Sequence, residues 1–238
     1  MGEYVCIPPY FVFRMRRYFI LLYLIGVALC CHAQSRQELR DSLKKAMEVL
    51  SYHPDSIDLR LKKAGWNLEL EEWAKAKDEY DWVLRTEPTN LAALYFRAFV
   101  NEKMARYHFA RLDYEHLLSL VPGNFEGQLG LALLNQKDQH YTEAYDQINR
   151  LCNQFPDSAV VFAARAGMEV ERGMIELAEY DFSEALKRDA NNPDYLLNRA
   201  EIRIRMGRMK DAKDDLDSLA AQGIPKGQLR EYYRRVKK

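Results

Sequence analysis

The residue types that most often carry chemistry are few in this chain, and their spacing is unfavourable for it. Four histidines follow residue 33, at His53, His108, His116 and His140, and only His108 and His116 share a predicted helix. Those two stand eight residues apart, about two helical turns, which is too far for them to share one metal ion. We therefore interpret all four as surface histidines and expect no metal site.

Carboxylates and sequence motifs give no better case for catalysis. Acidic pairs such as Glu71-Glu72 and Asp214-Asp215 lie in stretches rich in charge, where a solvated helix face is the ordinary explanation. The chain has no glycine-rich phosphate loop, no cysteine pair with metal spacing, no HExxH sequence and no nucleophile elbow. An enzyme would need an appended catalytic domain, for which we expect no room. The sequence predicts a non-enzymatic protein without a cofactor.

Length and composition restrict the fold. The 238 residues are 48% apolar and 29% charged, with 11 Gly and 8 Pro, which is enough for a packed core and too rich in apolar residues for disorder. The 35 Lys and Arg residues balance the 35 Asp and Glu residues, and this balance argues against a nucleic-acid binder that neutralises many phosphates. We expect a globular protein whose partner is not a nucleic acid.

The first 33 residues look like a secretory signal peptide. A basic stretch over residues 14–17 precedes an uncharged apolar run over residues 18–31, and Ala33 follows at a suitable cleavage position. We expect cleavage after Ala33 and export, to the periplasm or outside the cell. One alternative is an uncleaved membrane anchor, although the run is shorter than the ~20 residues of a spanning helix. Translation could also start at Met15 instead of Met1.

Export with cleavage would leave one cysteine, Cys152, so that the mature protein would hold no internal disulfide. A lone cysteine on a periodic helical stretch is usually a small core residue. We expect that role for Cys152.

From residue 57 onward the chain repeats itself every 34 residues. One alanine series has the members Ala64, Ala98, Ala132, Ala166 and Ala200, and a second has the members Ala76, Ala110, Ala144, Ala178 and Ala212. Prolines keep the same spacing at Pro54, Pro88, Pro122 and Pro156. Counting repeat positions from 1 at residues 57, 91, 125, 159 and 193 puts the two alanine series at positions 8 and 20.

Each repeat is expected to form two helices. Proline stops the helix before it, and the residue two places later is a good N-cap for the next helix: Ser56, Asn90, Asn124, Ser158 and Asn192. We predict first helices, called A, over residues 57–70, 91–104, 125–137, 159–172 and 193–206. We predict second helices, called B, over residues 72–86, 106–120, 140–154, 174–188 and 208–221. Gly173 and Gly207 fit the tight turn between A and B.

This pattern resembles the tetratricopeptide repeat (TPR) family. The fifth copy is similar to the variant with an Asn-Arg-Gly/Ala opening and an Ala-x-x-Asp-Phe/Leu second helix, through Asn198-Arg199-Ala200, Met206-Gly207, Asp211-Ala212 and Asp215-Leu216. The resemblance covers residues 57–224 in five repeats, 57–90, 91–124, 125–158, 159–192 and 193–224. It departs from the family in mid-helix A, where the usual aromatic is replaced by Asn67, Asn101, Asn135, Glu169 and Arg203.

The resemblance implies an all-α fold, a right-handed α-solenoid of TPR helix-turn-helix repeats whose A helices line a concave face. Family members are typically scaffolds, adaptors or co-chaperones. Residues 34–56 are expected to form an N-terminal capping helix. Residues 225–238, with six basic residues against Glu231, are expected to form a basic C-terminal capping helix. That tail could instead hold the protein on an anionic surface.

The family's groove positions are 2, 5, 9, 12 and 13 of helix A. Here their apolar members are Leu61, Leu68, Tyr95, Phe99, Leu129, Leu133, Val160, Val170, Leu197 and Ile204. Their acids are Asp58, Glu69, Glu102, Glu126, Glu171, Asp194 and Glu201, against the bases Lys103, Lys137 and Arg205. We therefore expect a partner protein or peptide with a basic, partly apolar segment, for which Gly65 and Gly167 leave room. The alternative is that the apolar residues only pack between neighbouring A helices.

Opposite charges also recur at a fixed spacing inside the repeats. Arg97, Arg165 and Arg199, at position 7, stand sixteen residues before Asp113, Asp181 and Asp215, at position 23. Lys63 and Glu79 have the same spacing, and in the third repeat both places are uncharged, with Leu131 and Gln147. The spacing predicts ion pairs that join helices A and B. The aromatic residues Trp66, Trp73, Tyr80, Tyr107, Tyr114 and Tyr141 are expected in the core.

Two functional hypotheses remain. The first is an exported scaffold or adaptor that binds a partner protein through the concave groove. The alternative is a membrane- or envelope-associated assembly factor, held to an anionic surface by the basic C-terminus or by an uncleaved N-terminal anchor.

Overall fold

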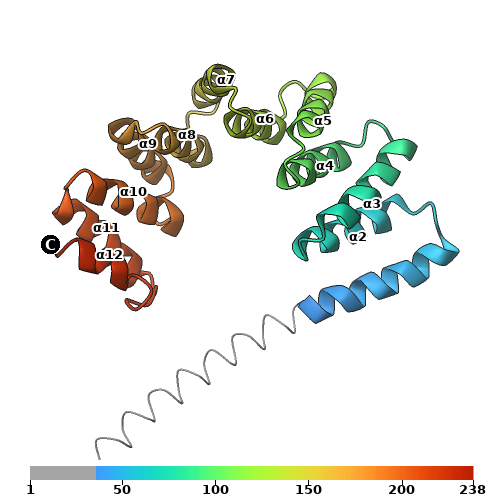
Figure 1. Cartoon of the computed structure of the whole chain (residues 1–238), viewed down its shortest axis with the longest axis horizontal. Coiled ribbons are helices and arrows are strands. Elements are labelled where there is room, and N and C mark those ends of the chain that lie inside the picture. Colours follow the sequence, from blue (N-terminus) through green and yellow to red (C-terminus); the bar gives the residue numbers. More distant parts are fainter. Residues whose placement is uncertain (1–35, 238) are drawn as a thin grey trace, which may run out of the picture. The chain divides into compact units, whose positions relative to one another are not determined.

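The computed structural model describes residues 36–237, so the predicted signal peptide lies outside the described part. The described residues form two compact units, which divide between Val100 and Asn101, and this boundary falls inside helix α4 (Figure 1). No helix of the described part is long and apolar enough to cross a membrane.

Helices follow one another in A and B pairs, as the repeat predicts. The A helices are α2 (Ile57–Glu69), α4 (Leu91–Lys103), α6 (Phe125–Lys137), α8 (Ala159–Glu171) and α10 (Pro193–Arg205). The B helices are α3 (Trp73–Thr86), α5 (Tyr107–Leu120), α7 (Tyr141–Gln154), α9 (Ile175–Arg188) and α11 (Met209–Ala221). A helix over residues 36–52 precedes them, and α12 (Arg230–Arg235) follows. Each predicted boundary of the A and B helices lies within one residue of the observed one. The capping helices are shorter than predicted, because the first ends at residue 52 and not at 56, and α12 covers only residues 230–235 of the predicted 225–238.

The first unit is built on the contact between α2 and α3. Ala64 and Ala76 are completely buried where the two helices meet, because only a small side chain lets two helix backbones approach closely. Tyr80 is 2% exposed and stacks on Phe96, with ring centroids 6.0 Å apart. Ala46, in the helix over residues 36–52, is also buried.

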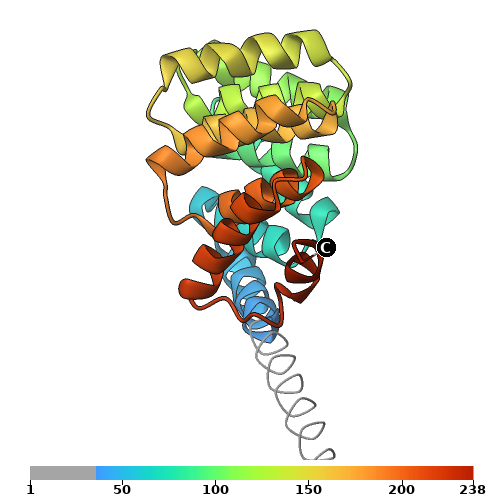
Figure 2. The ribbon, with the colours of Figure 1, turned by 90° about the vertical axis from the view of Figure 1, so that its left-hand side faces the viewer.

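The second unit repeats this packing in successive layers (Figure 2). Each A helix packs on its own B helix, and each B helix then packs on the A helix of the following repeat. The buried alanines of positions 8 and 20 recur in the core, together with Ile148, Phe182 and Leu216. Within this unit α6, α8 and α10 lie on its inner side and α7 lies on its outer side (Figure 1).

The predicted N-cap hydrogen bonds form at the asparagines but not at the serines. The side-chain oxygens of Asn90, Asn124 and Asn192 each accept a hydrogen bond from a backbone N–H of the first turn. The prediction is wrong for Ser56 and Ser158, which make no capping bond. The serine hydroxyl is one bond closer to the backbone than the asparagine oxygen, and in these two turns it does not reach the amide.

The turn between helices A and B has the same backbone conformation in every repeat. Its position 15 has a positive φ in all five, with Gly173 at 73° and Gly207 at 75° as predicted. The same conformation is adopted by Glu71, Ala105 and Gln139, at 60°, 54° and 63°. Side-chain-bearing residues rarely adopt this left-handed region, so three of the five turns are strained.

The aromatic residues predicted in the core are buried to different degrees. Tyr80 and Tyr114 are 2% exposed, whereas Trp66, Trp73 and Tyr107 are half-buried. Cys152, the only cysteine among the described residues, is buried, and burial raises the pKa of its thiol. The prediction is wrong for Tyr141, which is 40% exposed. Tyr141 is the first residue of α7, and the guanidinium of Arg172 lies over its ring, 4.9 Å from the centroid. The four histidines after residue 33 are exposed, as predicted.

Candidate partner-binding surface

The positions predicted to form ion pairs lie at the interface of helices A and B. Arg165 donates two hydrogen bonds to Asp181, at 2.5 and 2.8 Å, and Arg199 donates two to Asp215, at 3.2 and 2.7 Å. Lys63 lies 2.6 Å from Glu79. Because Asp181 and Asp215 are almost fully buried, these bidentate contacts fix how each A helix sits on its B helix.

The same arginines also reach back to the preceding repeat. Arg97 contacts Asp81 at 2.8 Å, Arg165 donates to Asn149 at 3.0 Å, and Arg199 donates to Ser183 at 3.1 Å. Each of these acceptors stands at position 25 of its repeat. The predicted pair of Arg97 with Asp113 would involve residues of both compact units and stays a prediction. Within the second unit, Asp113 accepts a hydrogen bond from Asn101 at 3.3 Å.

The residues that replace the family's mid-helix aromatic belong to this polar layer. In three repeats the residue at position 11 donates a hydrogen bond to the residue at position 23. The pairs are Asn101 with Asp113, Asn135 with Gln147 at 2.7 Å, and Arg203 with Asp215 at 2.8 Å. In the fourth repeat the residue at position 11 is Glu169, which can donate only while it is protonated. Burial and the neighbouring Asp181 raise the pKa of Glu169 to about 8.

The predicted groove residues of the second unit belong to α6, α8 and α10, the helices on its inner side (Figure 1). Leu129, Leu133, Val170 and Leu197 are half-buried, and Val160 is 48% exposed. Ile204 is only 8% exposed and belongs to the core. These apolar side chains lie on neighbouring helices and are partly exposed to water. A partner that binds over them could bury the apolar area that is still exposed.

The glycines of this surface differ in what surrounds them. A Cβ added at Gly167 would meet no atom within 4 Å, so the surface is open there. A Cβ at Gly130 would lie 2.6 Å from the ring of Tyr114, so the absence of a side chain at Gly130 serves packing. Of these two glycines, Gly167 is therefore the one that leaves space for a partner.

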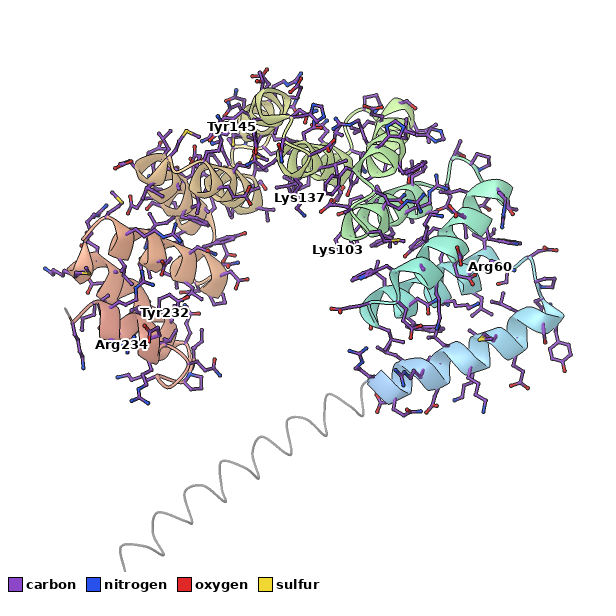
Figure 3. The ribbon with its side chains drawn as sticks, in the orientation of Figure 1. Arg60, Lys103, Lys137, Tyr145, Tyr232 and Arg234 are labelled. Atoms are coloured by element: carbon purple, nitrogen blue, oxygen red, sulfur yellow. The ribbon has the colours of Figure 1, made fainter. Side chains whose placement is uncertain are left out.

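Several of the predicted groove acids already have partners. Lys137, on the inner side of α6 (Figure 3), pairs with Glu102, and Gln136 donates to Glu171 at 2.9 Å. Glu126 and Asp194 are exposed and make no side-chain hydrogen bond or ion pair within the described part of the chain. Among the predicted groove acids of this unit, Glu126 at the beginning of α6 and Asp194 at the beginning of α10 are therefore the ones with a side chain open to a partner.

The C-terminal tail packs on the last repeat and reaches the same surface. Leu229 is buried, and Tyr232, Tyr233 and Val236 pack on the same apolar cluster (Figure 3). Arg235 donates to both oxygens of Glu201, at 2.5 and 3.0 Å.

Glu201 is shared between two arginines, because Arg205 contacts it at 3.2 Å. Although burial acts to raise the pKa of Glu201, hydrogen bonds from Arg235 and Arg205 lower it below its ordinary value. The spacing of Glu201 and Arg235, one repeat length, is the sequence feature that could have predicted this contact.

The first unit has a corresponding surface on α2 and the beginning of α4. Leu61, Leu68, Tyr95 and Phe99 are half-buried, and a Cβ at Gly65 would meet no atom within 4 Å. Phe99 is covered on one side by Trp73, whose ring lies edge-on at 6.4 Å. Phe99 therefore packs within its unit and also keeps part of its surface open.

No group of three His, Cys, Asp or Glu side chains in the described part is arranged to hold a metal ion. No protein-family model and no curated protein sequence matches the chain.

Solved structures similar to this chain include TPR proteins. A TPR protein of Parabacteroides merdae is 21% identical, with a TM-score of 0.72 over 86% of this chain and 80% of the other. A thermophilic TPR protein of Thermus thermophilus is 18% identical, with a TM-score of 0.63 over 77% and 100%. The pilF protein of Pseudomonas aeruginosa is 18% identical, with a TM-score of 0.61 over 72% and 78%. The chain has the all-α solenoid fold of TPR helix-turn-helix repeats.

Proposed function

We propose that the protein is a non-enzymatic scaffold or adaptor, and that it binds a partner protein or peptide on the surface formed by its A helices. The observation that carries this proposal is the row of half-buried apolar residues on α6, α8 and α10 beside the open space at Gly167. The B helices also expose apolar side chains, among them Phe109 and Leu112 on α5 and Leu177 and Tyr180 on α9, but α7, which lies between these two helices in the chain, presents Glu143 and Asp146 to solvent. Proteins with this fold commonly act as scaffolds.

The partner segment is proposed to be basic and partly apolar. Leu133 and Leu197 would contribute most of the affinity, since burial of apolar side chains dominates recognition of a helix or an extended peptide. Glu126 and Asp194 would attract lysine or arginine residues of the partner, because charges of one sign on a hollow surface concentrate the field there. Acids that already form an ion pair within the protein, such as Glu102 with Lys137, would attract a basic partner only weakly and would contribute mainly to the shape of the surface.

The segments outside the repeats complete the proposal. Residues 1–33 direct export and are removed, so that the mature protein works in the periplasm or outside the cell. Residues 34–56 and 225–238 cap the five repeats, which span 57–224. Intact-mass measurement of the native protein tests the first point, and a soluble species that retains Met1 or Met15 would contradict it.

The alternative function is an envelope-associated assembly factor held to an anionic membrane by the basic tail or by an uncleaved N-terminal anchor. The packing of Tyr232, Tyr233 and Val236 on the last repeat favours the capping role, because it leaves only the basic side chains of the tail for a surface. Fractionation of the native host separates the two functions.

A charge-reversal pair with a matched control tests the proposed surface. A partner is first purified from the native host with the protein as bait, and its affinity is then measured. Glu126→Lys with Asp194→Lys is expected to weaken binding at low salt by at least about fivefold. Glu143→Lys with Asp146→Lys makes the same charge change on the outer side of α7 and is expected to leave the affinity unchanged. Equal effects of the two double variants would overturn the proposal.

A further inference from the structure

The third repeat contains a cavity that the groove does not include. It has a volume of about 230 Å³ and lies between α5, α6 and α7, all in the second unit. Leu118, Leu131 and Leu151 line it, and the last two are buried. The exposed side chains of Arg150 and Gln154 stand at its opening.

The cavity forms where the third repeat departs from the others in three positions. Position 7 is Leu131 in place of a lysine or arginine, and position 23 is Gln147 in place of an acid. Position 4 is Gln128, half-exposed, whereas Leu94, Phe162 and Leu196 are buried at this position in the second, fourth and fifth repeats; the first repeat has Arg60 there. The third repeat therefore lacks both the ion pair of the first, fourth and fifth repeats and the large apolar side chain of the second, fourth and fifth.

The lining combines apolar walls with one cation. Gln128 donates to the backbone oxygen of Pro122 at 2.7 Å, and Gln147 accepts from Asn135, so both amides are held in place. Nε of Arg150 donates to the backbone oxygen of Asp146 at 3.2 Å. The terminal nitrogens of Arg150 have no partner among the described residues, so they can bind an incoming carboxylate.

The volume limits what can bind. Pockets for whole small molecules are usually about 300 Å³ or more, whereas about 230 Å³ accommodates one large apolar side chain. We propose that this cavity is a second docking site of the protein, which takes one leucine- or phenylalanine-sized side chain of a partner segment with a carboxylate beside it on Arg150. Its partner chemistry is acidic and apolar, unlike the basic segment proposed for the groove.

Short peptides test the site without knowledge of the partner. Acetyl-Glu-Phe-Glu-amide is titrated into the protein while the methyl resonances of Leu131 and Leu151 and the Nε–H resonance of Arg150 are followed by NMR. Saturable shifts of all three are expected at millimolar peptide. Acetyl-Glu-Ala-Glu-amide should bind at least about tenfold more weakly, because the buried ring is lost. Acetyl-Gln-Phe-Gln-amide should bind about two- to fivefold more weakly, as for an exposed ion pair.

Two variants fill the cavity with side chains that the chain already uses at these positions. Gln128→Phe introduces the residue of the fourth repeat, and Leu131→Arg with Gln147→Asp restores the ion pair of the other repeats. Either variant should fold, as checked by circular dichroism, and should abolish the shifts. Glu126→Lys with Asp194→Lys should leave them unchanged, because those residues lie outside the cavity.

The absence of saturable shifts in the unmodified protein, or shifts that persist in a folded variant with the cavity filled, would overturn the proposal. Equal binding of the glutamate and glutamine peptides would overturn the role of Arg150.

Discussion

Arg165 binds Asp181 through two hydrogen bonds, from Nε to Oδ2 at 2.5 Å and from Nη2 to Oδ1 at 2.8 Å. Glu169 lies one helical turn after Arg165 and is 4% exposed. Its Oε2 is buried without a hydrogen-bond partner. Asn101 and Asn135 donate to position 23 in the second and third repeats, and Glu169 can take that role toward Asp181 only while it holds a proton.

This arrangement predicts that Glu169 makes folding stability depend on pH. The pKa of Glu169 is raised to about 8 by burial and by Asp181, above its value in the unfolded chain, so its contribution is fully present below about pH 4.5 and is lost as the pH rises to about 8. Glu169→Gln donates at every pH. We expect it to match the unmodified protein near pH 4.5 and to be more stable by at least about 1 kcal/mol at pH 8.

Urea unfolding at pH 4.5, 6 and 8 measures this difference. Glu143→Gln, an exposed glutamate of the outer surface, is the control and should show no pH-dependent gain. A Glu169→Gln gain that does not grow between pH 4.5 and 8 would show that Glu169 is ionised in the folded protein.

The turns at position 15 predict a second stability effect. Ala105 has a φ of 54° and Gly173 a φ of 73°, in the region where a Cβ is strained. Ala105→Gly is expected to stabilise the protein by about 0.5–1 kcal/mol, because the strain removed exceeds the added entropy of the unfolded chain. Gly173→Ala is expected to destabilise it by about 1 kcal/mol. Thermal unfolding of both variants checks this, and shifts of the same sign would contradict it.

The two helix glycines of the inner surface should respond in opposite directions. Gly167→Ala is expected to stabilise the protein by roughly 0.8 kcal/mol, because alanine favours the helix and no atom lies within 4 Å of the new Cβ. Gly130→Ala should destabilise it, because the Cβ would lie 2.6 Å from the buried ring of Tyr114. Denaturant unfolding distinguishes the two, and a stabilising Gly130→Ala would show that the ring of Tyr114 moves easily.

Arg235 is expected to compete with a basic partner for Glu201. Arg235→Ala removes the contact with Glu201 and should tighten binding of the groove partner by about two- to fivefold at low salt. Arg234→Ala is the control, because Arg234 pairs only with Glu231 in the described part of the chain. A point substitution is preferable to deletion of the tail, since Leu229 and Tyr232 belong to the apolar cluster of the last repeat. Equal affinities of the two variants would exclude competition.

The repeat made most of the fold predictable, because helix boundaries, buried alanines and position 7 to position 23 contacts all follow from one 34-residue spacing. Differences between equivalent residues were harder to predict. Asn124 caps its helix and Ser158 does not, although both types are good caps in general. The strain at Ala105 and Gln139 was not predicted because only the glycines of that position attract notice in a sequence.

The sequence predicted which residues belong to the candidate surface but not how far each of their side chains is exposed. The spacing placed Ile204 and Val160 on the same face, yet Ile204 is buried and Val160 is 48% exposed, since exposure depends on the neighbouring helices. The net charge of the surface also differs from the predicted one, because Lys137 on α6 forms an ion pair with Glu102 on α4 and neutralises it. The cavity of the third repeat depends on Gln128, whose significance appears only when position 4 is compared across packed repeats.

The most direct test of the proposed binding surface is site-specific photo-crosslinking to the partner obtained from the native host. A benzophenone side chain is placed at Val160, 48% exposed on the inner surface, or at Leu177, 52% exposed on α9, a B helix. The proposed function predicts a crosslinked complex from position 160 and none from position 177, and Glu126→Lys with Asp194→Lys should remove the crosslink. Crosslinking from position 177 alone, or equally from both positions, would contradict the claim that the A helices form the binding surface.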